Sequence, residues 1–577
     1  MPTEATSVYG YMVRSGTVRF RCGTESGTVD VSVGASPRPA PPGLTAWCSL
    51  STESGGLRAT LHVKNSMGLP VEILSAHLET NVFLSPAAKV FANGWQSDSV
   101  SDLVRISEGL RQPRYVSAKD RACGDYDLVH YGPGRVHSWS YTYFGSGEDF
   151  SFAGSLDETT AFTRFDFVTP SRHGPASLSI HSDCEGLVLP PLSRVSGSVE
   201  APCRLADVFL VRGGETSCVD AYATLRRKAW RESKGPRPQH RLAGPPALLW
   251  DAGPRAAPFD EGELAAVLDP FRVLEVPLDA VILGRQPVSG LRTLFARIRQ
   301  TGALPGATLS PFLCPKQSET YRERKEYIAQ DERGRLVRIG TGGAPKGAHF
   351  VLDFYRPACR RHLEMLFHTL IADCGAGILR LEDLHVASLL GGAGRGRTRA
   401  QAMQDAVRLI QDLCHCVPFI AAGVPLGAAF DTVDYAAVAP SAPFRPVRPA
   451  LFDQRLRERA TAADAVRTVL SRRHLDGRTF RSDPGVFTLL RSRDRALDAG
   501  NHRLFQACTI FGGIVATSDP VGVYSPSMME QFREAVLHRG SRLFEKRVHE
   551  LKREPDGSHS VVYDLQGDRR GITIDKA

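Results

Sequence analysis

The stretch that decides the fold is Ile378-Leu379-Arg380-Leu381-Glu382-Asp383-Leu384-His385, in which an apolar run ends in two adjacent carboxylates. Residues 358–373 before it have the apolar spacing of an amphipathic helix, and residues 399–414 after it repeat that spacing. A glycine-rich loop separates the strand from the second helix. Helix, short strand, charged strand end, loop and helix are typical of one unit of a (β/α)8 barrel. Because chemistry in such barrels sits at the C-terminal ends of the strands, Glu382 and Asp383 are the first catalytic candidates.

The same strand–helix pattern repeats through residues 243–530, where apolar strand candidates alternate with helical patterns. Strands are expected at 247–250, 278–283, 306–309, 349–354, 377–382, 418–421 and 433–438. Further helices are expected at 261–268, 290–299, 460–472 and 501–511. Alternation of this kind predicts a parallel sheet, and this many units in one region favour a (β/α)8 barrel over a doubly wound sheet. No glycine-rich phosphate loop follows a strand, so a nucleotide site has no support.

The flanking regions predict β-structure. Residues 1–235 contain many short runs with period-2 alternation, separated by Gly, Pro, Ser and Asn, which indicate a large β-sandwich. A linker signal, Lys234-Gly235-Pro236-Arg237-Pro238, ends this region. Residues 540–577 contain two further strand candidates and predict a small C-terminal β-domain. Within the first region, residues 91–99 predict a loop that carries an exposed aromatic, Trp95.

Composition excludes several classes of protein. With 577 residues, 42% hydrophobic and 23% charged, the chain is expected to be soluble and globular. It shows no apolar run long enough to span a membrane and no secretory signal, which predicts a cytoplasmic location and no membrane partner. The net charge of +9 is spread along the chain, so nucleic-acid binding is not expected. The twelve cysteines contain no Cys-x-x-Cys, and Cys414-His415-Cys416 lacks further ligands, so neither a metal nor a cofactor is expected.

Short motifs along most of the chain add a family resemblance. Asn93-Gly94-Trp95-Gln96-Ser97 resembles the Asn-x-Trp-Gln-Ser-Trp loop of the α-galactosidases of glycoside hydrolase family 36. Further motifs of that family are matched, in the same order, by Leu304-Pro305-Gly306 with Ser310-Pro311-Phe312, Val351-Leu352-Asp353, Thr398-Arg399-Ala400-Gln401-Ala402, Gly423-Val424-Pro425-Leu426, Val433-Asp434 and Ser482-Asp483-Pro484. The resemblance implies the β-sandwich, barrel and β-tail already expected from the sequence pattern.

The resemblance also implies where the catalytic groups should lie. It places Arg380 on the family's active-site Lys, Glu382 on the nucleophile and Ser441 on the acid/base carboxylate. A retaining glycosidase needs two carboxyl groups, and a serine hydroxyl is too weak an acid to protonate a leaving oxygen near neutral pH. If the register shifts by one residue, Asp383 takes the nucleophile position, but adjacent strand residues face opposite sides. Either way the second carboxylate of the pair is missing.

Sugar recognition is altered in the same way. The family's paired aspartates correspond to Val281-Ile282-Leu283-Gly284, and the second Trp of the sandwich loop corresponds to Asp98. The apolar side chains of Ile282 and Leu283 cannot accept hydrogen bonds from sugar hydroxyls. The candidate ligand-binding residues at the barrel mouth are Trp95, Asp98, Arg285, Asp353, Arg380 and His385. Each also has a structural interpretation: strand-end carboxylates can pair with Arg or cap a helix, His385 can be a loop residue, and Arg285 can be solvated.

Three functions remain open from the sequence. The first is a family 36 homologue without ordinary α-galactosidase activity, a pseudoenzyme that binds a partner or an altered ligand. The second is an active α-glycoside hydrolase that uses Glu382 or Asp383, which requires a second carboxylate within about 10 Å. The third is a binding or assembly module that uses the sandwich. The resemblance implies a carbohydrate ligand at the barrel mouth and allows a homo-oligomer.

Overall fold

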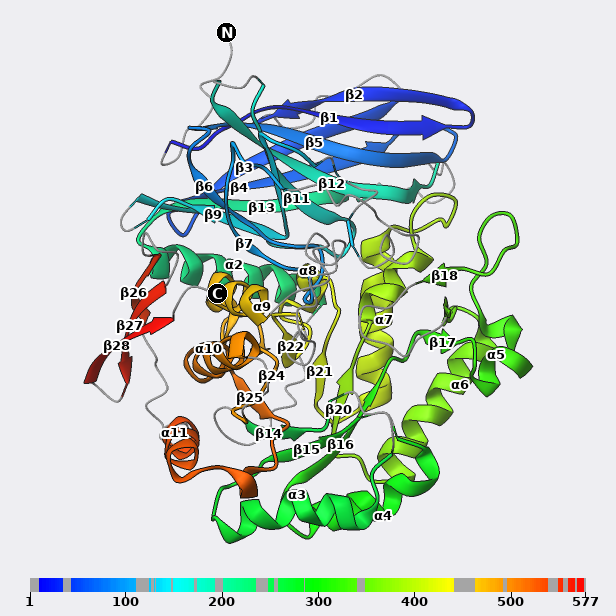
Figure 1. Ribbon diagram of the computed structural model, residues 1–577. Coiled ribbons are helices and arrows are strands. Elements are labelled where there is room, and N and C mark those ends of the chain that lie inside the picture. Colours follow the sequence, from blue (N-terminus) through cyan, green and yellow to red (C-terminus); the bar gives the residue numbers. More distant parts are fainter. Residues whose placement is uncertain are drawn as a thin grey trace.

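The structure is a computed structural model, and it describes residues 10–34, 43–110, 124–125, 129, 131–146, 149–170, 174–191, 201–234, 247–253, 258–284, 286–339, 348–440, 462–490, 495–537, 548–553, 559–565 and 568–574. An N-terminal set of strands lies at one end of the molecule, and a parallel sheet with its helices forms the other (Figure 1). A small C-terminal sheet lies at the left of the same view.

The N-terminal strands form a 13-stranded sheet, counted over the described residues, in the order β7-β6-β9-β10-β13-β4-β3-β2-β1-β5-β12-β11-β8. Their bounds are β1 Val13–Cys22, β2 Glu25–Val33, β3 Leu44–Glu53, β4 Gly56–Asn65, β5 Val71–Leu84, β6 Lys89–Ala92, β7 Asp102–Arg105, β8 Arg135–Trp139, β9 Tyr141–Phe144, β10 Phe150–Ser155, β11 Phe162–Val168, β12 Ala176–Leu189 and β13 Cys203–Gly213. The pairs are antiparallel except β2 with β3. In β4 and β5, buried and less buried residues alternate, as the period-2 pattern predicted.

The central region forms a parallel sheet of nine strands within the described residues, in the order β23-β22-β21-β20-β16-β15-β14-β25-β24. Their bounds are β14 Ala247–Asp251, β15 Ala280–Leu283, β16 Leu304–Leu309, β20 Ile378–Leu381, β21 Phe419–Ala421, β22 Tyr435–Ala437, β23 Arg481–Asp483, β24 Val486–Phe487 and β25 Ile514–Thr517. The first strand, β14, pairs on one side with β15 and on the other with β25, near the end of the region. Neighbouring first and last strands are the connectivity of a barrel-like sheet.

Alternate residues of these strands pack into one apolar cluster. Its buried members come from most strands of the sheet: Leu249, Ala280, Ile282, Ile378, Ile420, Tyr435, Ile514 and Ala516. The residues between them, such as Val281, Leu379 and Val515, belong to the larger core instead. Because successive strand side chains point to opposite faces, the small cluster fills the concave face of the sheet and the larger core lies beneath the helices.

Helix α2 follows β13 of the N-terminal sheet, and the other helices lie between or after the strands of the central region. Their bounds are α2 Glu215–Lys234, α3 Glu261–Val273, α4 Val288–Arg299, α5 Glu319–Glu323, α6 Pro357–His368, α7 Arg399–Cys414, α8 Leu426–Ala429, α9 Ala462–Ser471, α10 Arg495–Phe511 and α11 Pro526–Leu537. Shorter helical turns are η2 Lys325–Tyr327, η3 Thr369–Asp373, η4 Leu384–Leu390, η6 Arg473–Leu475 and η7 Val521–Val523. Helix α7 begins with a capping box, in which Thr398 and Gln401 satisfy each other's backbone N–H groups. Every described helix is too short or too polar to cross a membrane.

One expected strand of the parallel sheet lies elsewhere. Residues 349–354 were predicted to join it, but β19 (His349–Val351) pairs antiparallel with β17 (Leu313–Pro315) and β18 (Arg338–Ile339) in a separate sheet. The prediction is wrong because a short apolar run shows only burial. Here the burial comes from a local cluster that includes Cys314, Phe350 and Leu352. Strands β23, β24 and β25 supply positions in the parallel sheet that the sequence pattern did not predict.

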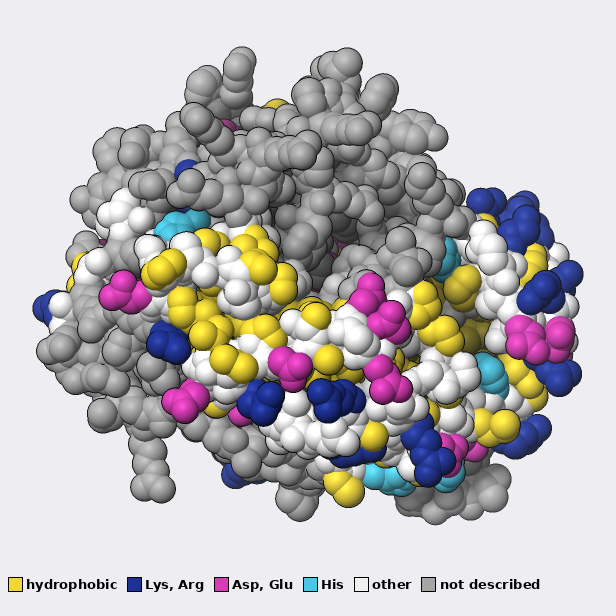
Figure 2. Space-filling view, turned by 60° about the horizontal axis from the view of Figure 1, so that its bottom comes forward, with side chains coloured by type: hydrophobic (Ala, Val, Ile, Leu, Met, Phe, Trp, Pro, Cys, Tyr) yellow, Lys and Arg dark blue, Asp and Glu magenta, His cyan; other side chains and the backbone are white. Residues whose placement is uncertain are grey.

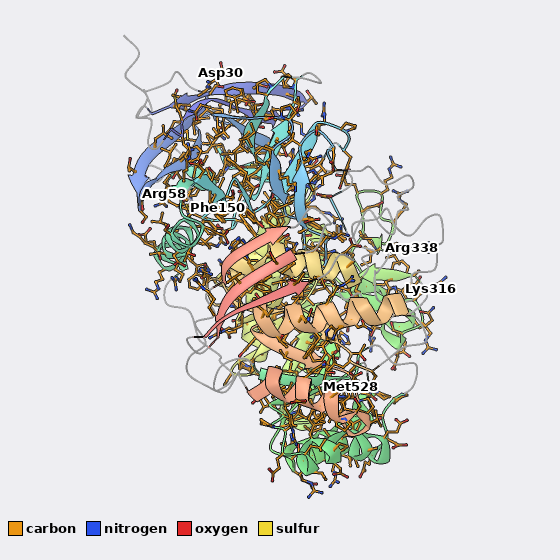
Figure 3. All side chains as sticks on the ribbon, turned by 60° about the vertical axis from the view of Figure 1, so that its left-hand side comes forward. Asp30, Arg58, Phe150, Lys316, Arg338 and Met528 are labelled. Carbon is orange, nitrogen blue, oxygen red and sulfur yellow. The ribbon has the colours of Figure 1, made fainter. Side chains whose placement is uncertain are left out.

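The N-terminal sheet and the parallel sheet share a core. Phe150 of β10, labelled in Figure 3, lies 6.0 Å from the ring of His474 in η6. The ring centroid of Tyr141 in β9 similarly lies 6.1 Å from that of Phe430, after α8.

The C-terminal sheet consists of β26 Val548–Arg553, β27 His559–Leu565 and β28 Asp568–Ile574. Val561 of β27 belongs to the same core. On the face shown in Figure 2, the described acidic, basic and apolar side chains are interspersed.

Candidate functional site

Arg380 of β20 lies on the concave face of the parallel sheet between two carboxylates. Its Nε is 2.9 Å from Asp251 Oδ2 at the end of β14, and its Nη2 donates to Asp483 Oδ2 at the end of β23, 2.7 Å away. All three side chains are buried. Strands β14 and β23 each lie three positions from β20, which is about 14 Å in a flat sheet. The two ion pairs therefore require the sheet to curve strongly around Arg380.

The electrostatics of this cluster hold Arg380 charged. Burial alone would lower the pKa of Arg380, but Asp483, Asp251 and Glu382 together raise it. Burial raises the pKa of Asp251, against the opposing effect of Arg380. The backbone N–H of Gly253 donates to Asp251 and that of Gly485 donates to Asp483. The charge of Arg380 is thus balanced by its ion pairs with Asp251 and Asp483.

Glu382 and Asp383 diverge at the end of β20. Glu382 follows Arg380 by two residues, which places it on the same face, and its charge acts on Arg380. Asp383 has a left-handed backbone, with φ of 56°, and its Oδ2 accepts a hydrogen bond of 2.9 Å from Ser310 Oγ. Both residues are partly buried. The adjacent carboxylates therefore have different neighbours, and the left-handed backbone of Asp383, beyond the end of β20, sets its direction.

The loop after β6 reaches into this region, but not as the sequence predicted. Trp95 is only 4% exposed, so the expectation of an exposed aromatic is wrong. The buried guanidinium of Arg472 donates to Asn93 Oδ1, to the carbonyl oxygens of Gln96 and Ser97, and to that of Val438. The Ser97 N–H also donates to Val424 O at 2.8 Å. The sequence alone does not point to Arg472, because no motif distinguishes it from the other arginines.

Asp98, at the end of this loop, lies beside the strand-end carboxylates. Its carboxyl accepts a hydrogen bond from the backbone N–H of Gly423, and Ser97 Oγ lies 3.4 Å from its Oδ1. Burial and the nearby Asp383 raise the pKa of Asp98 to about 6, while Arg472 and Arg380 oppose that rise. Asp98 is therefore a carboxyl group that changes charge near neutral pH, next to a second carboxylate.

His385 completes the group. It is 3% exposed, and its Nδ1 lies 3.1 Å from the carbonyl oxygen of Gly423. Burial lowers the pKa of His385, against the opposing charge of Asp383, so the ring is neutral near pH 7. A neutral ring that faces a carbonyl oxygen must donate, so Nδ1 carries the proton. The Trp95 ring lies 6.2 Å from that of His385, at an angle of 74°.

The structure thus brings together Trp95, Asp98, Arg380, Asp383 and His385, with Glu382 beside Arg380. Asp353 lies at the start of α6, where its carboxylate accepts from the Tyr355 N–H and from Arg356 Nε. Arg285 and Ser441 lie outside the described residues. Among the residues that the structure describes, no group of three or more His, Cys, Asp or Glu side chains is placed to hold a metal ion.

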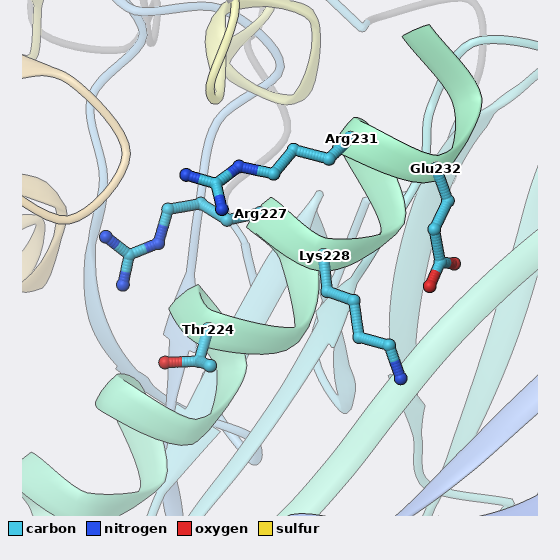
Figure 4. Close-up of a pocket in the computed structure, with 5 residues that line it drawn as sticks. All are labelled: Thr224, Arg227, Lys228, Arg231 and Glu232. Carbon is cyan, nitrogen blue, oxygen red and sulfur yellow. The ribbon is translucent and has the colours of Figure 1, made fainter. Parts of the chain in front are cut away.

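A surface pocket lies away from this site, on α2. It has a volume of about 450 Å³ and is lined by Thr224, Arg227, Lys228, Arg231 and Glu232. Figure 4 shows Arg227 and Arg231 on one side of the helix and Lys228 on another. All five are exposed residues of a single helix, which suits solvated charges better than a ligand site.

Comparison with solved structures identifies the class of fold. The α-galactosidase TtGalA from Thermus thermophilus, solved with p-nitrophenyl α-D-galactopyranoside, aligns with a TM-score of 0.65 and 18% identity over 93% of this chain and 98% of that chain. The GH36 α-galactosidase AgaA from Geobacillus stearothermophilus aligns with a TM-score of 0.53 and 10% identity over 96% of this chain and 77% of that chain. No family model and no curated protein matches the sequence. The chain has the fold of the GH36 α-galactosidases, as the motif resemblance implied.

Proposed function

We propose that this protein is a carbohydrate-binding relative of the family 36 α-galactosidases that lacks ordinary α-galactosidase activity. In this proposal the parallel sheet is a (β/α)8 barrel within residues 243–530, and the strands of residues 1–235 form a sandwich beside it. Residues 540–577 then form the C-terminal β-domain. TtGalA has been solved with p-nitrophenyl α-D-galactopyranoside and with stachyose, so an α-galactoside is the first ligand to test.

The observation that carries the proposal is the composition of the concave face. At β15, where the family has its aspartate pair, Ile282 packs into the apolar cluster and Leu283 into the larger core. Arg380 lies on the same face, two residues nearer the C-terminal end of the strands than Ile282, and its charge is neutralised by Asp251 and Asp483. A sugar at this position would meet aliphatic groups and an occupied guanidinium instead of carboxylates that accept from its hydroxyls.

The catalytic positions support the same conclusion. Ser441, at the acid/base position of the family, cannot donate a proton to a leaving oxygen near neutral pH. Glu382, at the nucleophile position, carries one more methylene group than Asp. A displacement of about 1 Å costs roughly 100-fold in rate. Hydrolysis would therefore need an acid at another position. Asp98, which lies beside Asp383, is the candidate for that acid.

The test combines binding with turnover. Methyl α-D-galactopyranoside is titrated into the purified protein by calorimetry, and release of p-nitrophenol from p-nitrophenyl α-D-galactopyranoside is followed in parallel. We expect saturable binding without p-nitrophenol release. Absence of binding for every α-glycoside tested would reject a carbohydrate role, whereas turnover that disappears in Asp98→Asn would make the protein an active glycosidase with a relocated acid.

A further inference from the structure

The contact between the N-terminal loop and the parallel sheet contains two polar ring atoms without a partner among the described residues. These are Nε1 of Trp95 and Nε2 of His385, and both side chains are more than nine-tenths buried. Leaving a buried donor or acceptor unsatisfied costs about 1–3 kcal/mol, so such atoms point to a missing partner.

The two atoms are complementary. Indole Nε1–H is a donor only, and because Nδ1 of His385 donates to Gly423, its Nε2 is an acceptor. The ring centroids lie 6.2 Å apart. One hydroxyl oxygen placed between the rings could accept from Trp95 and donate to His385. Water and a sugar both supply that group.

A carboxyl pair lies against the same histidine. Gly423 joins the groups, because its N–H donates to Asp98 and its carbonyl oxygen accepts from His385. A Cβ at Gly423 would lie 3.2 Å from both Asp383 Cα and His385 Nδ1, which shows how closely these residues pack. The charged and titratable groups that face Asp98 are Asp383, Arg472, Arg380 and, across Gly423, His385.

We propose that Trp95, Asp98 and His385 form a hydroxyl-binding subsite for a neutral sugar, with Asp383 beside it. This inference rests on the proposed carbohydrate role and says which residues recognise the ligand in place of the lost aspartate pair. Trp95 and His385 hold one hydroxyl, and Asp98 in its neutral form both donates to the ligand and accepts from it. The subsite joins the N-terminal loop to the parallel sheet, so neither part binds the sugar alone.

Binding is then pH-dependent through Asp98. Burial and Asp383 raise the pKa of Asp98 to about 6, so below pH 6 the group is a carboxylic acid. Above pH 6 Asp98 carries a charge beside Asp383 and can no longer donate a hydrogen bond to the sugar. Wild-type affinity for methyl α-D-galactopyranoside should fall about tenfold between pH 5 and pH 7.5, the size of one hydrogen bond.

The experiment is calorimetric titration of that sugar at pH 5 and pH 7.5. Asp98→Asn mimics the neutral acid, so it should bind equally at both pH values, near the wild-type affinity at pH 5. Asp98→Ser should lose affinity at both. Asp331→Asn, in an exposed turn ion-paired with Arg335, is the matched control and should follow the wild type. Thermal unfolding of each variant shows that it is folded.

A second experiment tests whether Trp95 and His385 bind a sugar hydroxyl or a resident water molecule. Trp95→Phe removes the indole donor and should weaken sugar binding about fivefold to tenfold. Trp47→Phe is its matched control, because Trp47 stacks on His62 in the N-terminal sheet, with ring centroids 5.3 Å apart. Unchanged affinity in Trp95→Phe means that the two rings hold water only, which overturns the role of the rings.

The outcomes distinguish the two proposals. If the wild type binds sugar but Asp98→Asn keeps the wild-type pH dependence, or Asp98→Ser binds as tightly as the wild type, the subsite is wrong and the carbohydrate role stands. If the wild type binds no α-glycoside at either pH, the carbohydrate role fails and the subsite fails with it.

Discussion

Glu158 shows how one buried side chain couples stability to pH. Its carboxylate lies between Ser140 Oγ and the Thr163 N–H, at 3.0 and 3.1 Å. Gly427 of α8 packs directly on it, and a Cβ there would come within 1.5 Å of Glu158 Oε2. Burial raises the pKa of Glu158 to about 7, against the opposing charge of Arg226. The folded protein therefore keeps this proton up to a higher pH than the unfolded chain does.

The sign of the resulting pH effect follows from linkage. Between the unfolded pKa of about 4.5 and the folded value, the folded state binds more protons, so its stability falls as pH rises. Glu158→Gln should match the wild type below pH 4.5 and gain about 3 kcal/mol relative to it by pH 8. Urea unfolding across that range measures the difference, with exposed Glu108→Gln as the control. A difference that does not grow with pH would contradict the account.

We expect the protein to lose stability when the charge of Arg380 is removed. Arg380→Met leaves Asp251 and Asp483 buried without their shared partner, which should cost about 3–5 kcal/mol of unfolding free energy at pH 7. Acid should reduce the loss, because burial raises the pKa of Asp251 and its protonated form no longer needs a cation. Denaturant titrations at pH 7 and pH 5 test both statements. Arg361→Met, on the outer surface of α6, is the control, and a loss below about 1 kcal/mol would show that the ion pairs do not hold the strands together.

At the scale of elements, Arg472 fixes the loop of residues 93–98 to the parallel sheet. Arg472→Met removes hydrogen bonds to Asn93, Gln96 and Ser97 at once. Backbone amide exchange of the loop should rise at least tenfold while that of β20 stays slow, because each lost buried bond is worth about 1 kcal/mol or more. Arg467→Met, on neighbouring α9, should leave the loop protected. Equal protection of the loop in both variants would mean that other contacts hold it.

The sequence predicted those elements whose signals are local. Helix α7 spans the predicted residues 399–414 because its apolar period and its Thr398 cap both lie within one short stretch. The assignment of residues 349–354 failed because an apolar run does not reveal which sheet it joins. For the site, the motif resemblance pointed to Trp95, Asp98 and Arg380. The partners of Arg380 were not predictable, since they depend on the curvature that brings β14 and β23 to β20.

At the scale of the whole molecule, the shared core predicts joint unfolding. Ring contacts such as Tyr141 with Phe430 and Phe150 with His474 cross between the N-terminal strands and the parallel sheet. Large apolar contacts of this kind make two regions unfold as one unit. Calorimetry should therefore show one main transition for both regions. Two separate transitions, or a stable and soluble fragment that begins at residue 243, would contradict this.

The measurement that tests the central claim most directly is turnover of a panel of aryl α-glycosides, α-galactoside included. Wild type, Glu382→Gln and Asp383→Asn are assayed at matched concentration, with thermal unfolding to show that each is folded. The account predicts that the wild type releases no more phenol than either variant. Wild-type turnover that vanishes in one of the two variants would contradict it, and the protein would be an active glycosidase whose acid is not at position 441.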